Sequence, residues 1–220
     1  MGGDPGGWSL ALAHGRVVAI AVDADPVAIA DLHADEQTAV AALAPGRRPE
    51  WIAGRRALRA ALRAVGGDGA AGGPLLTDDR GAPRLPAGLV GSISHKRALA
   101  VALAAGDDGW RVGVDLEALA PRRFDIAPRV LTAPERAALA GVTGLARDHA
   151  VLRAFALKEA VYKAIDPFLR RHVGFLEVEV WPDDAGGAVV EGAPAWGLAI
   201  EATWQERDEH VLCTARARRR

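Results

Sequence analysis

The sequence predicts an α+β fold made of two similar halves. The order of expected strands and helices in the first half is repeated in the second, and two pairs of segments resemble each other. Leu32–Glu36 resembles Leu131–Glu135, and Trp51–Arg59 aligns without gaps on Phe155–Lys163. Repetition of this kind indicates a duplicated structural unit. We therefore expect a pseudo-dimer of two related α/β halves.

The first half is expected to begin with two strands and continue with two helices. Alternating small apolar residues over 8–23 predict a hairpin that turns near His14 and Gly15. Early acidic residues favour a helix over 31–43, because they complement the helix dipole. Apolar residues at helical spacing favour a second helix over 48–64.

A loop and two further strands complete this half. The glycine-rich segment 66–74 is expected to be irregular, and Asp79–Pro83 is typical of a turn. Residues 89–104 then predict two short strands around Ser94–Arg97.

A second cycle of elements begins at Trp110. A strand is expected over Arg111–Glu117, and a helix opens at Thr132–Glu135, where the threonine can cap and the proline lies in the first turn. The remaining expected elements are a longer helix over 147–165 and strands over 175–181, 197–204 and 210–217.

A chain of 220 residues is long enough for two small domains, and we expect them over 1–108 and 109–220. Half of the residues are hydrophobic and a quarter are charged, as in ordinary globular proteins. The formal net charge of −1 provides no overall field for nucleic acid or an anionic membrane. Local clusters of charge must therefore hold any anionic ligand.

The sequence also favours a cytoplasmic protein with no membrane partner. Its single cysteine, Cys213, cannot form an internal disulfide, which fits a reducing compartment. The N-terminal residues lack the pattern of a secretory signal, and no apolar stretch approaches membrane-spanning length. A phosphate-binding P-loop, a Cys-x-x-Cys pair and a Gly-x-Ser-x-Gly elbow are all absent from the sequence.

Two charged patterns of the second half indicate a magnesium and phosphate site. Asp115 and Glu117 lie two apart on a predicted strand and so face the same way. Glu159 and Lys163 lie four apart on a predicted helix, beside Lys158, and so share one face. Carboxylates with nearby ammonium groups suit a divalent cation that bridges phosphate oxygens. Taken singly, the same residues also fit solvated strand acids and a surface ion pair.

The first half contains a second polar set. Ser92–His95 offers hydroxyl, backbone N–H and imidazole groups that can hold a phosphate. Arg47, Arg48 and Arg55 lie near the start of a helix, where basic residues do not complement the dipole and so are candidates for ligand binding. An ordinary loop and a solvated helix face remain the alternatives. The basic tail Arg216–Arg220 fits either a solvated end or a dock for an acidic partner.

Five motifs in order and spacing resemble the 4′-phosphopantetheinyl transferases of the surfactin/enterobactin type. The motifs are Arg47 with Arg55, Gly81–Pro83, Ser92–His95, Gly113–Glu117 and Phe155–Lys163. The resemblance implies a pseudo-dimeric fold with coenzyme A and Mg²⁺, or Mn²⁺ in its place, bound between the halves. It also implies a monomer, unlike the shorter trimeric holo-acyl-carrier-protein synthases.

The resemblance further implies roles for single residues. Asp115, Glu117 and Glu159 would hold the metal against the coenzyme A pyrophosphate, which Lys158 and Lys163 would contact. The first half would bind the adenosine 3′-phosphate end through Ser94, His95, Arg47, Arg55 and Arg80, the last standing where the family often has a lysine.

The implied reaction transfers phosphopantetheine to a serine of an apo acyl or peptidyl carrier protein of fatty acid, polyketide or nonribosomal peptide synthesis. Glu159 or a water on the metal would accept the serine proton, and adenosine 3′,5′-bisphosphate would leave. Two other readings stay open at this point: a metal-dependent phosphodiesterase that hydrolyses coenzyme A, and a non-enzymatic module that binds it.

Overall fold

The computed structural model describes residues 7–22, 29–30, 32–96, 98–120, 124–191 and 196–220. Asp23, Asp31 and Arg97, which belong to predicted elements, lie outside the described residues. The chain divides into two compact units, Met1–Val112 and Gly113–Arg220. None of the helices in the described ranges is long and apolar enough to cross a membrane.

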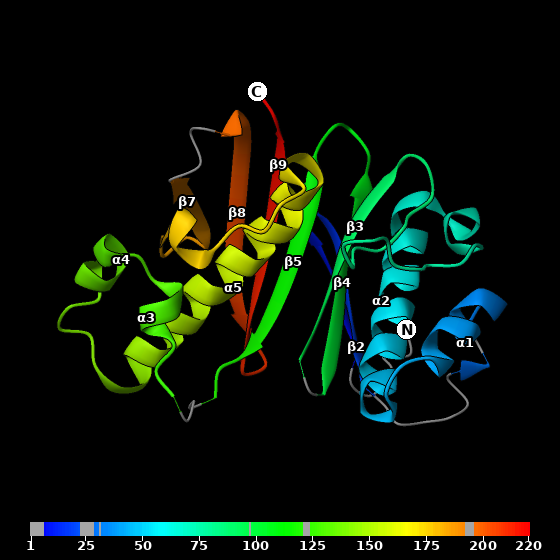
Figure 1. Ribbon diagram of the computed structural model, residues 1–220, viewed down its shortest axis with the longest axis horizontal. Helices are drawn as coiled ribbons and strands as arrows, with labels where there is room; N and C mark the ends of the chain where they lie inside the picture. Colours follow the sequence, from blue (N-terminus) through cyan, green and yellow to red (C-terminus); the bar gives the residue numbers. More distant parts are fainter. Residues whose placement is uncertain (1–6, 23–28, 31, 97, 121–123, 192–195) are drawn as a thin grey trace. The chain divides into compact units, whose positions relative to one another are not determined.

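The first unit is an antiparallel sheet of four strands with helices packed on it (Figure 1). Its strands are β1 (Trp8–Leu12), β2 (Gly15–Ala21), β3 (Leu89–Lys96) and β4 (Leu99–Gly106), in the spatial order β1-β2-β4-β3. Its helices are α1 (Ala34–Ala41) and α2 (Arg48–Gly66), with 3₁₀ turns at Pro45–Arg47 and Asp68–Ala71.

The apolar face of α2 explains why it lies on this sheet. Ala57, Leu58, Ala61 and Leu62 recur at helical spacing, and all are buried against Ala102 and Ala104 of β4. The predicted hairpin is confirmed, since Leu12 lies opposite Gly15. The first predicted helix is shorter than expected, because His33 caps its N-terminus.

The second unit has a five-stranded sheet in the order β5-β9-β8-β7-β6. Its strands are β5 (Arg111–Ala118), β6 (Glu179–Pro182), β7 (Gly187–Glu191), β8 (Leu198–Arg207) and β9 (His210–Arg219). Its helices are α3 (Ala127–Val130), α4 (Ala133–Ala138) and the long α5 (Gly144–Leu169), with a 3₁₀ turn at Phe175–Glu177.

The core of this unit lies between α5 and the sheet. Ala156, Leu157, Ala160 and Val161 are fully buried, in one cluster with alternate residues of β9 such as Cys213. The strand predicted over 175–181 is wrong in its first half, because Phe175–Glu177 forms a 3₁₀ turn. The hairpin of β6 with β7 was not expected from the sequence.

The two units repeat one topology, as the sequence predicted. In the first, β2, α1, α2, β3 and β4 follow each other, and the sheet order is β2-β4-β3. In the second, β5, α4, α5, β8 and β9 occur in the same order, with α3 added after β5 and with β6 and β7 added before β8, and the corresponding sheet order is β5-β9-β8. The fold is therefore α+β with an internal duplication.

The register of the repeat differs from the predicted alignment of the helices. Glu36 pairs with Arg59 and Glu135 pairs with Lys158, in both cases 23 residues further along the chain. Arg59 therefore corresponds to Lys158, and its predicted alignment on Lys163 is wrong. Both helices are rich in alanine, leucine and cations, so matching residue types alone did not distinguish the two registers.

The close approach of β5 and α5 depends on Gly113. A Cβ atom on this residue would lie 1.9 Å from the carbonyl oxygen of Ala160 and 2.9 Å from the backbone nitrogen of Ala164. Backbone atoms cannot move aside as a flexible side chain can. The absence of a side chain at Gly113 thus lets α5 pack against the strand that carries Asp115.

We expect Gly113→Ala to lower the free energy of unfolding by about 1–3 kcal/mol or more, as overpacking does in other cores. Gly106→Ala is the matched control, because a Cβ at that strand end would meet nothing within 4 Å. Urea denaturation of both variants measures the difference, and equal stability of the two would contradict the packing argument.

Candidate metal and phosphate sites

Asp115 and Glu117 lie on the face of β5 that is turned toward α5. They alternate with Gly113, whose missing side chain faces the backbone of α5, so all three share one face of the strand. Each carboxylate residue is only 5% exposed. The predicted pairing of these two acids on one strand face agrees with this geometry.

Glu159 lies on α5 in the electrostatic field of these two acids. Burial raises the pKa of Glu159 above its ordinary value, and the negative charges of Asp115 and Glu117 raise it further. The ammonium group of Lys163 acts in the opposite direction. Three acids of one unit thus repel each other within a partly buried environment, which favours the binding of a cation.

Lys163 lies against the β5 acids. Its Nζ donates to Asp115 Oδ1 at 2.8 Å and to the carbonyl oxygen of Val114 at 2.8 Å. The Lys163 side chain is 29% exposed, whereas that of Asp115 is 7% exposed. Lys163 therefore lies at the boundary between the buried acids and solvent, where a phosphate can reach it.

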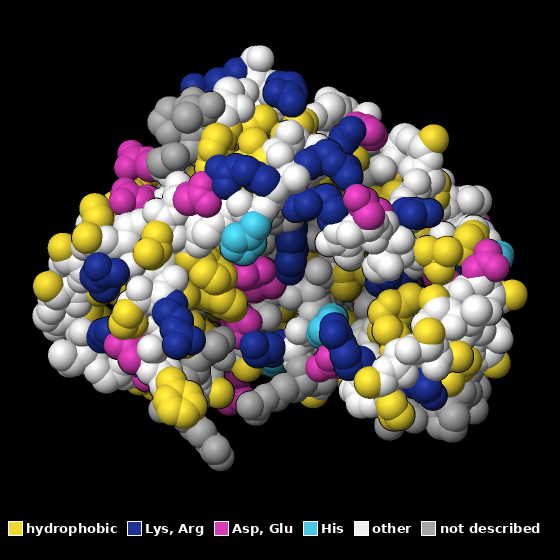
Figure 2. Space-filling view, viewed as in Figure 1, with side chains coloured by type: hydrophobic (Ala, Val, Ile, Leu, Met, Phe, Trp, Pro, Cys, Tyr) yellow, Lys and Arg dark blue, Asp and Glu magenta, His cyan; other side chains and the backbone are white. Residues whose placement is uncertain are grey.

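On the face drawn in Figure 2, acidic side chains lie beside basic and histidine side chains over α5 and β5. No group of three His, Cys, Asp or Glu side chains among the described residues forms a ready-made metal site. Mg²⁺ commonly binds through one or two carboxylates and completes its shell with water and substrate phosphates. The oxygen donors present fit an ion of that kind, with phosphate oxygens completing its shell.

Lys158 is placed differently from Lys163. Its side chain has no exposed surface, and its Nζ donates to Glu135 Oε2 at 2.6 Å. It also donates to the carbonyl oxygens of Val130 at 2.8 Å and Phe175 at 2.9 Å. All three donors of the ammonium group are used, so nothing is left for the pyrophosphate contact expected from the sequence.

Glu135 completes this buried arrangement. Its carboxylate accepts from the backbone N–H of Thr132 at 2.7 Å and of Val180 at 2.8 Å, in addition to Lys158. Thr132 in turn caps α4 as predicted. The role of Glu135 was not predicted, although Thr132-x-x-Glu135 is the sequence signature of a capping box.

The first unit brings two of the predicted residues to α2. The Arg55 guanidinium lies over the Trp51 ring at 4.4 Å from its centroid. Arg55 is 5% exposed, and its Nη2 is buried without a hydrogen-bond partner among the described residues. His95 Nδ1 lies 3.3 Å from Glu50 Oε2, one residue before Trp51. Trp51 and Glu50 were not among the predicted site residues.

The remaining predicted residues of this unit lie on other elements. Ser94 is buried, and as the strand neighbour of His95 it points to the opposite face of the sheet. Arg47 caps α2 by its position and is exposed. Arg80 lies at the tip of a turn, where its N–H donates to Asp78 Oδ1 at 2.8 Å. Their roles stay predictions.

Two models of known protein families match this chain. The family model "4′-phosphopantetheinyl transferase N-terminal domain" matches residues 35–105, and the model "4′-phosphopantetheinyl transferase superfamily" matches residues 111–215. Enterobactin synthase component D of Salmonella typhimurium is 31% identical over 173 residues, which are 76% of this chain and 70% of that protein.

Two further similarities were found. The 4′-phosphopantetheinyl transferase Svp of Streptomyces mobaraensis is 38% identical over 167 residues, which are 74% of this chain and 65% of Svp, slightly less than two thirds of its length. A holo-(acyl-carrier-protein) synthase structure from Bacillus anthracis is 24% identical and matches with a TM-score of 0.42, over 50% of this chain and 96% of that chain.

We expect Lys158→Met to lower the free energy of unfolding by about 3–5 kcal/mol, because it leaves the Glu135 carboxylate buried without its cation. Lys163→Met is the comparison on the same helix, and we expect it to cost less than Lys158→Met, because the Lys163 side chain is 29% exposed and water can reach its pair with Asp115. Urea denaturation measures both. A similar loss in the two variants would show that burial does not separate these lysines.

We expect Glu159→Gln to stabilise the metal-free protein at neutral pH. The pKa of Glu159 is raised in the folded state, above the ordinary value of 4.5. A raised pKa means that its stabilising contribution is present below pH 4.5 and is lost as the pH rises through the folded value. The amide cannot ionise, so the variant escapes this loss.

The measurement is the thermal unfolding midpoint in the presence of a chelator, at pH 4 and at pH 7.5. The gain of the Glu159→Gln variant over the unmodified protein should be larger at pH 7.5. If the variant gained the same number of degrees at both pH values, ionisation of Glu159 would not destabilise the folded protein, and the prediction would be wrong.

Proposed function

This chain belongs to the 4′-phosphopantetheinyl transferase superfamily, and from that premise we propose that it transfers the 4′-phosphopantetheine arm of coenzyme A to a serine of an apo carrier protein. The observation that carries the proposal is the position of Lys163, paired with the buried Asp115 in the unit that also holds Glu117 and Glu159. A cation for phosphate and oxygen donors for a metal are thereby combined on β5 and α5.

Asp115 and Glu117 would hold the metal, with Glu159 as the third carboxylate. When bound, Mg²⁺, or Mn²⁺ in its place, would neutralise charge on the pyrophosphate oxygens. Lys163 would leave its contact with Asp115 in part and bind a pyrophosphate oxygen, stabilising the charge that develops as the bond breaks. Lys158 would not contact the ligand; its ion pair with Glu135 would instead hold α5 in position.

Glu159 is our candidate for the general base. Its carboxylate is a proton acceptor on the face of α5 that carries Lys163, and a water on the metal is the alternative base. It would take the proton of the carrier serine as the hydroxyl oxygen attacks the β-phosphorus of coenzyme A. The bond from this phosphorus to the bridging oxygen would break, and adenosine 3′,5′-bisphosphate would leave with that oxygen.

The first unit would bind the adenosine phosphate end of coenzyme A. Arg55 offers a buried Nη2 that no described residue satisfies, and a phosphate oxygen would supply its partner. Arg47, Arg80, Ser94 and His95 are the further candidates for this end. The partners would be acyl or peptidyl carrier proteins of fatty acid, polyketide or nonribosomal peptide synthesis, met by a cytoplasmic monomer.

The test is intact mass spectrometry of an apo acyl or peptidyl carrier protein incubated with this protein, coenzyme A and Mg²⁺. We expect the carrier to gain the mass of one phosphopantetheine arm, and to gain none when a chelator is present. No gain on carriers of every class would reject the proposal. Hydrolysis of coenzyme A without a carrier would favour a phosphodiesterase.

Asp115→Ala and Glu159→Ala should each reduce transfer by about 100-fold or more, since each removes a group from the reacting centre. Glu206→Ala is the control, because this acid of the second unit pairs with Arg153 near the surface and should leave turnover unchanged. Circular dichroism checks that all three variants are folded. Near-normal turnover of either site variant would reject the assignment of the carboxylates.

A further inference from the structure

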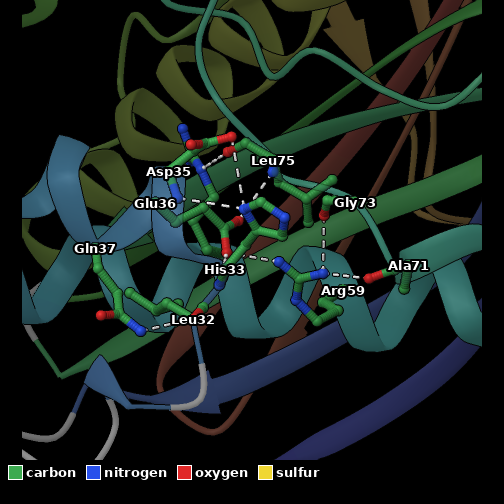
Figure 3. Close-up of polar contacts among 10 residues, drawn as sticks. Leu32, His33, Asp35, Glu36, Gln37, Arg59, Ala71, Gly73 and Leu75 are labelled. Atoms are coloured by element: carbon green, nitrogen blue, oxygen red, sulfur yellow. Dashed lines mark hydrogen bonds and ion pairs between the residues drawn. The ribbon is translucent and has the colours of Figure 1, made fainter.

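The carboxylate of Glu36 connects three separate parts of the first unit. It has no exposed surface, and it accepts from the backbone N–H of His33 at 2.8 Å, the backbone N–H of Leu75 at 2.9 Å and Arg59 Nη2 at 2.6 Å. Figure 3 shows these donors around it, with Arg59 also reaching the carbonyl oxygen of Gly73. A buried charge is tolerated only with such a set of partners.

The peptide groups of Leu75 are held from two sides. Its N–H donates to Glu36, and its carbonyl oxygen accepts from Arg55 Nε. One residue thus lies between the buried carboxylate and the arginine that we assign to the adenosine phosphate end. A movement of Leu75 would change the direction of the Arg55 guanidinium, because Nε is committed to that carbonyl.

Leu75 also leads directly into the turn that carries Arg80. The carbonyl oxygen of Leu76 accepts from the N–H of Arg84 at 2.8 Å, and the N–H of Asp78 donates to the carbonyl oxygen of Ala82 at 2.8 Å. The Asp78 carboxylate accepts from the N–H groups of Arg80 at 2.8 Å and of Ala82 at 2.9 Å. These hydrogen bonds connect the two arms of the turn and its tip, so we infer that the position of its base at Leu75 determines where the tip lies.

Glu36 also favours the charged form of Arg55. Burial lowers the pKa of Arg55 to about 10, and the negative charge of Glu36 opposes that change. Its guanidinium is packed on Trp51, and its Nη2 is buried without a partner among the described residues. Direction and charge of the same group are thus both linked to Glu36.

The second unit supplies an internal comparison. Glu135 has the same three kinds of partner, namely the N–H of its capping residue, a cation of the long helix and a backbone N–H further along the chain. In the shared register, however, Ala154 takes the place of Arg55. The buried glutamate of the second unit therefore has no arginine to position.

We propose that Glu36, acting through Leu75, is a positioning residue for Arg55 and for the turn that carries Arg80, and that it thereby determines selectivity for the 3′-phosphate of the nucleotide. This inference rests on the proposed function, which supplies the nucleotide. Glu36 lies on α1 and has no exposed surface, so it would influence ligand selection without contacting the ligand.

Isothermal titration calorimetry with adenosine 3′,5′-bisphosphate and with adenosine 5′-monophosphate tests it on the full chain. Glu36→Gln should weaken binding of the bisphosphate by about tenfold and change binding of the monophosphate by about twofold or less. Glu36→Asp keeps the charge but is one methylene too short to reach Leu75. It should show the same selective loss, and normal binding in this variant would overturn positioning through Leu75.

Glu135→Gln is the matched control, because it removes the corresponding charge in the unit that has no such arginine. We expect it to lower the thermal unfolding midpoint as Glu36→Gln does, while leaving the affinities for both nucleotides within about twofold. If Glu135→Gln weakened binding of the bisphosphate as much as Glu36→Gln does, general destabilisation would explain the loss, and the proposal would be overturned. If the unmodified protein binds neither nucleotide, the proposed function itself fails. If the unmodified protein binds the bisphosphate and the Glu36 variants bind it equally well, this inference alone fails.

Discussion

Each unit depends on the hydrogen bonds and ion pair of one buried glutamate, Glu36 in the first unit and Glu135 in the second, which we call the glutamate clasp. In both units a glutamate at the third position of a short helix closes a capping box, pairs with a cation of the long helix and accepts a backbone N–H from a later segment. Because the carboxylate is sealed from water, it is stable only when all of these partners are present. Short helix, long helix and following segment are therefore fixed to each other by one group.

The acids of β5 and α5 are arranged in the opposite way. Asp115, Glu117 and Glu159 gather like charges, and burial with mutual repulsion raises the pKa of Glu159. Lys163 offsets part of this repulsion at the edge of the group. Such an arrangement weakens the metal-free fold and is typical of sites that await a cation or a phosphate. The clasp next to it, through Lys158, holds α5 against that strain.

The lysines of α5 illustrate what could and could not be predicted. The motif Lys158-Glu159 followed by Lys163 indicated a charged helix face, and Glu159 and Lys163, four residues apart, do share one. Lys158 and Lys163 are five residues apart, which is about 140° around a helix, so they cannot point the same way. The family resemblance nonetheless implied a pyrophosphate contact for both. The structure gives Lys158 three acceptors inside the unit instead.

The sequence by itself determined the longer helices, most strands, the duplication and the paired acids of β5, because these follow from periodicity and from neighbours a few residues apart. Only the tertiary structure decided which cation is buried, in which register the halves correspond and to which face of β3 Ser94 turns. These outcomes depend on contacts between distant segments, such as Glu36 with Leu75, 39 residues apart, and Glu135 with Val180, 45 residues apart. Local patterns carry no information about such partners, since the energy of a buried charge depends on whatever the fold brings next to it.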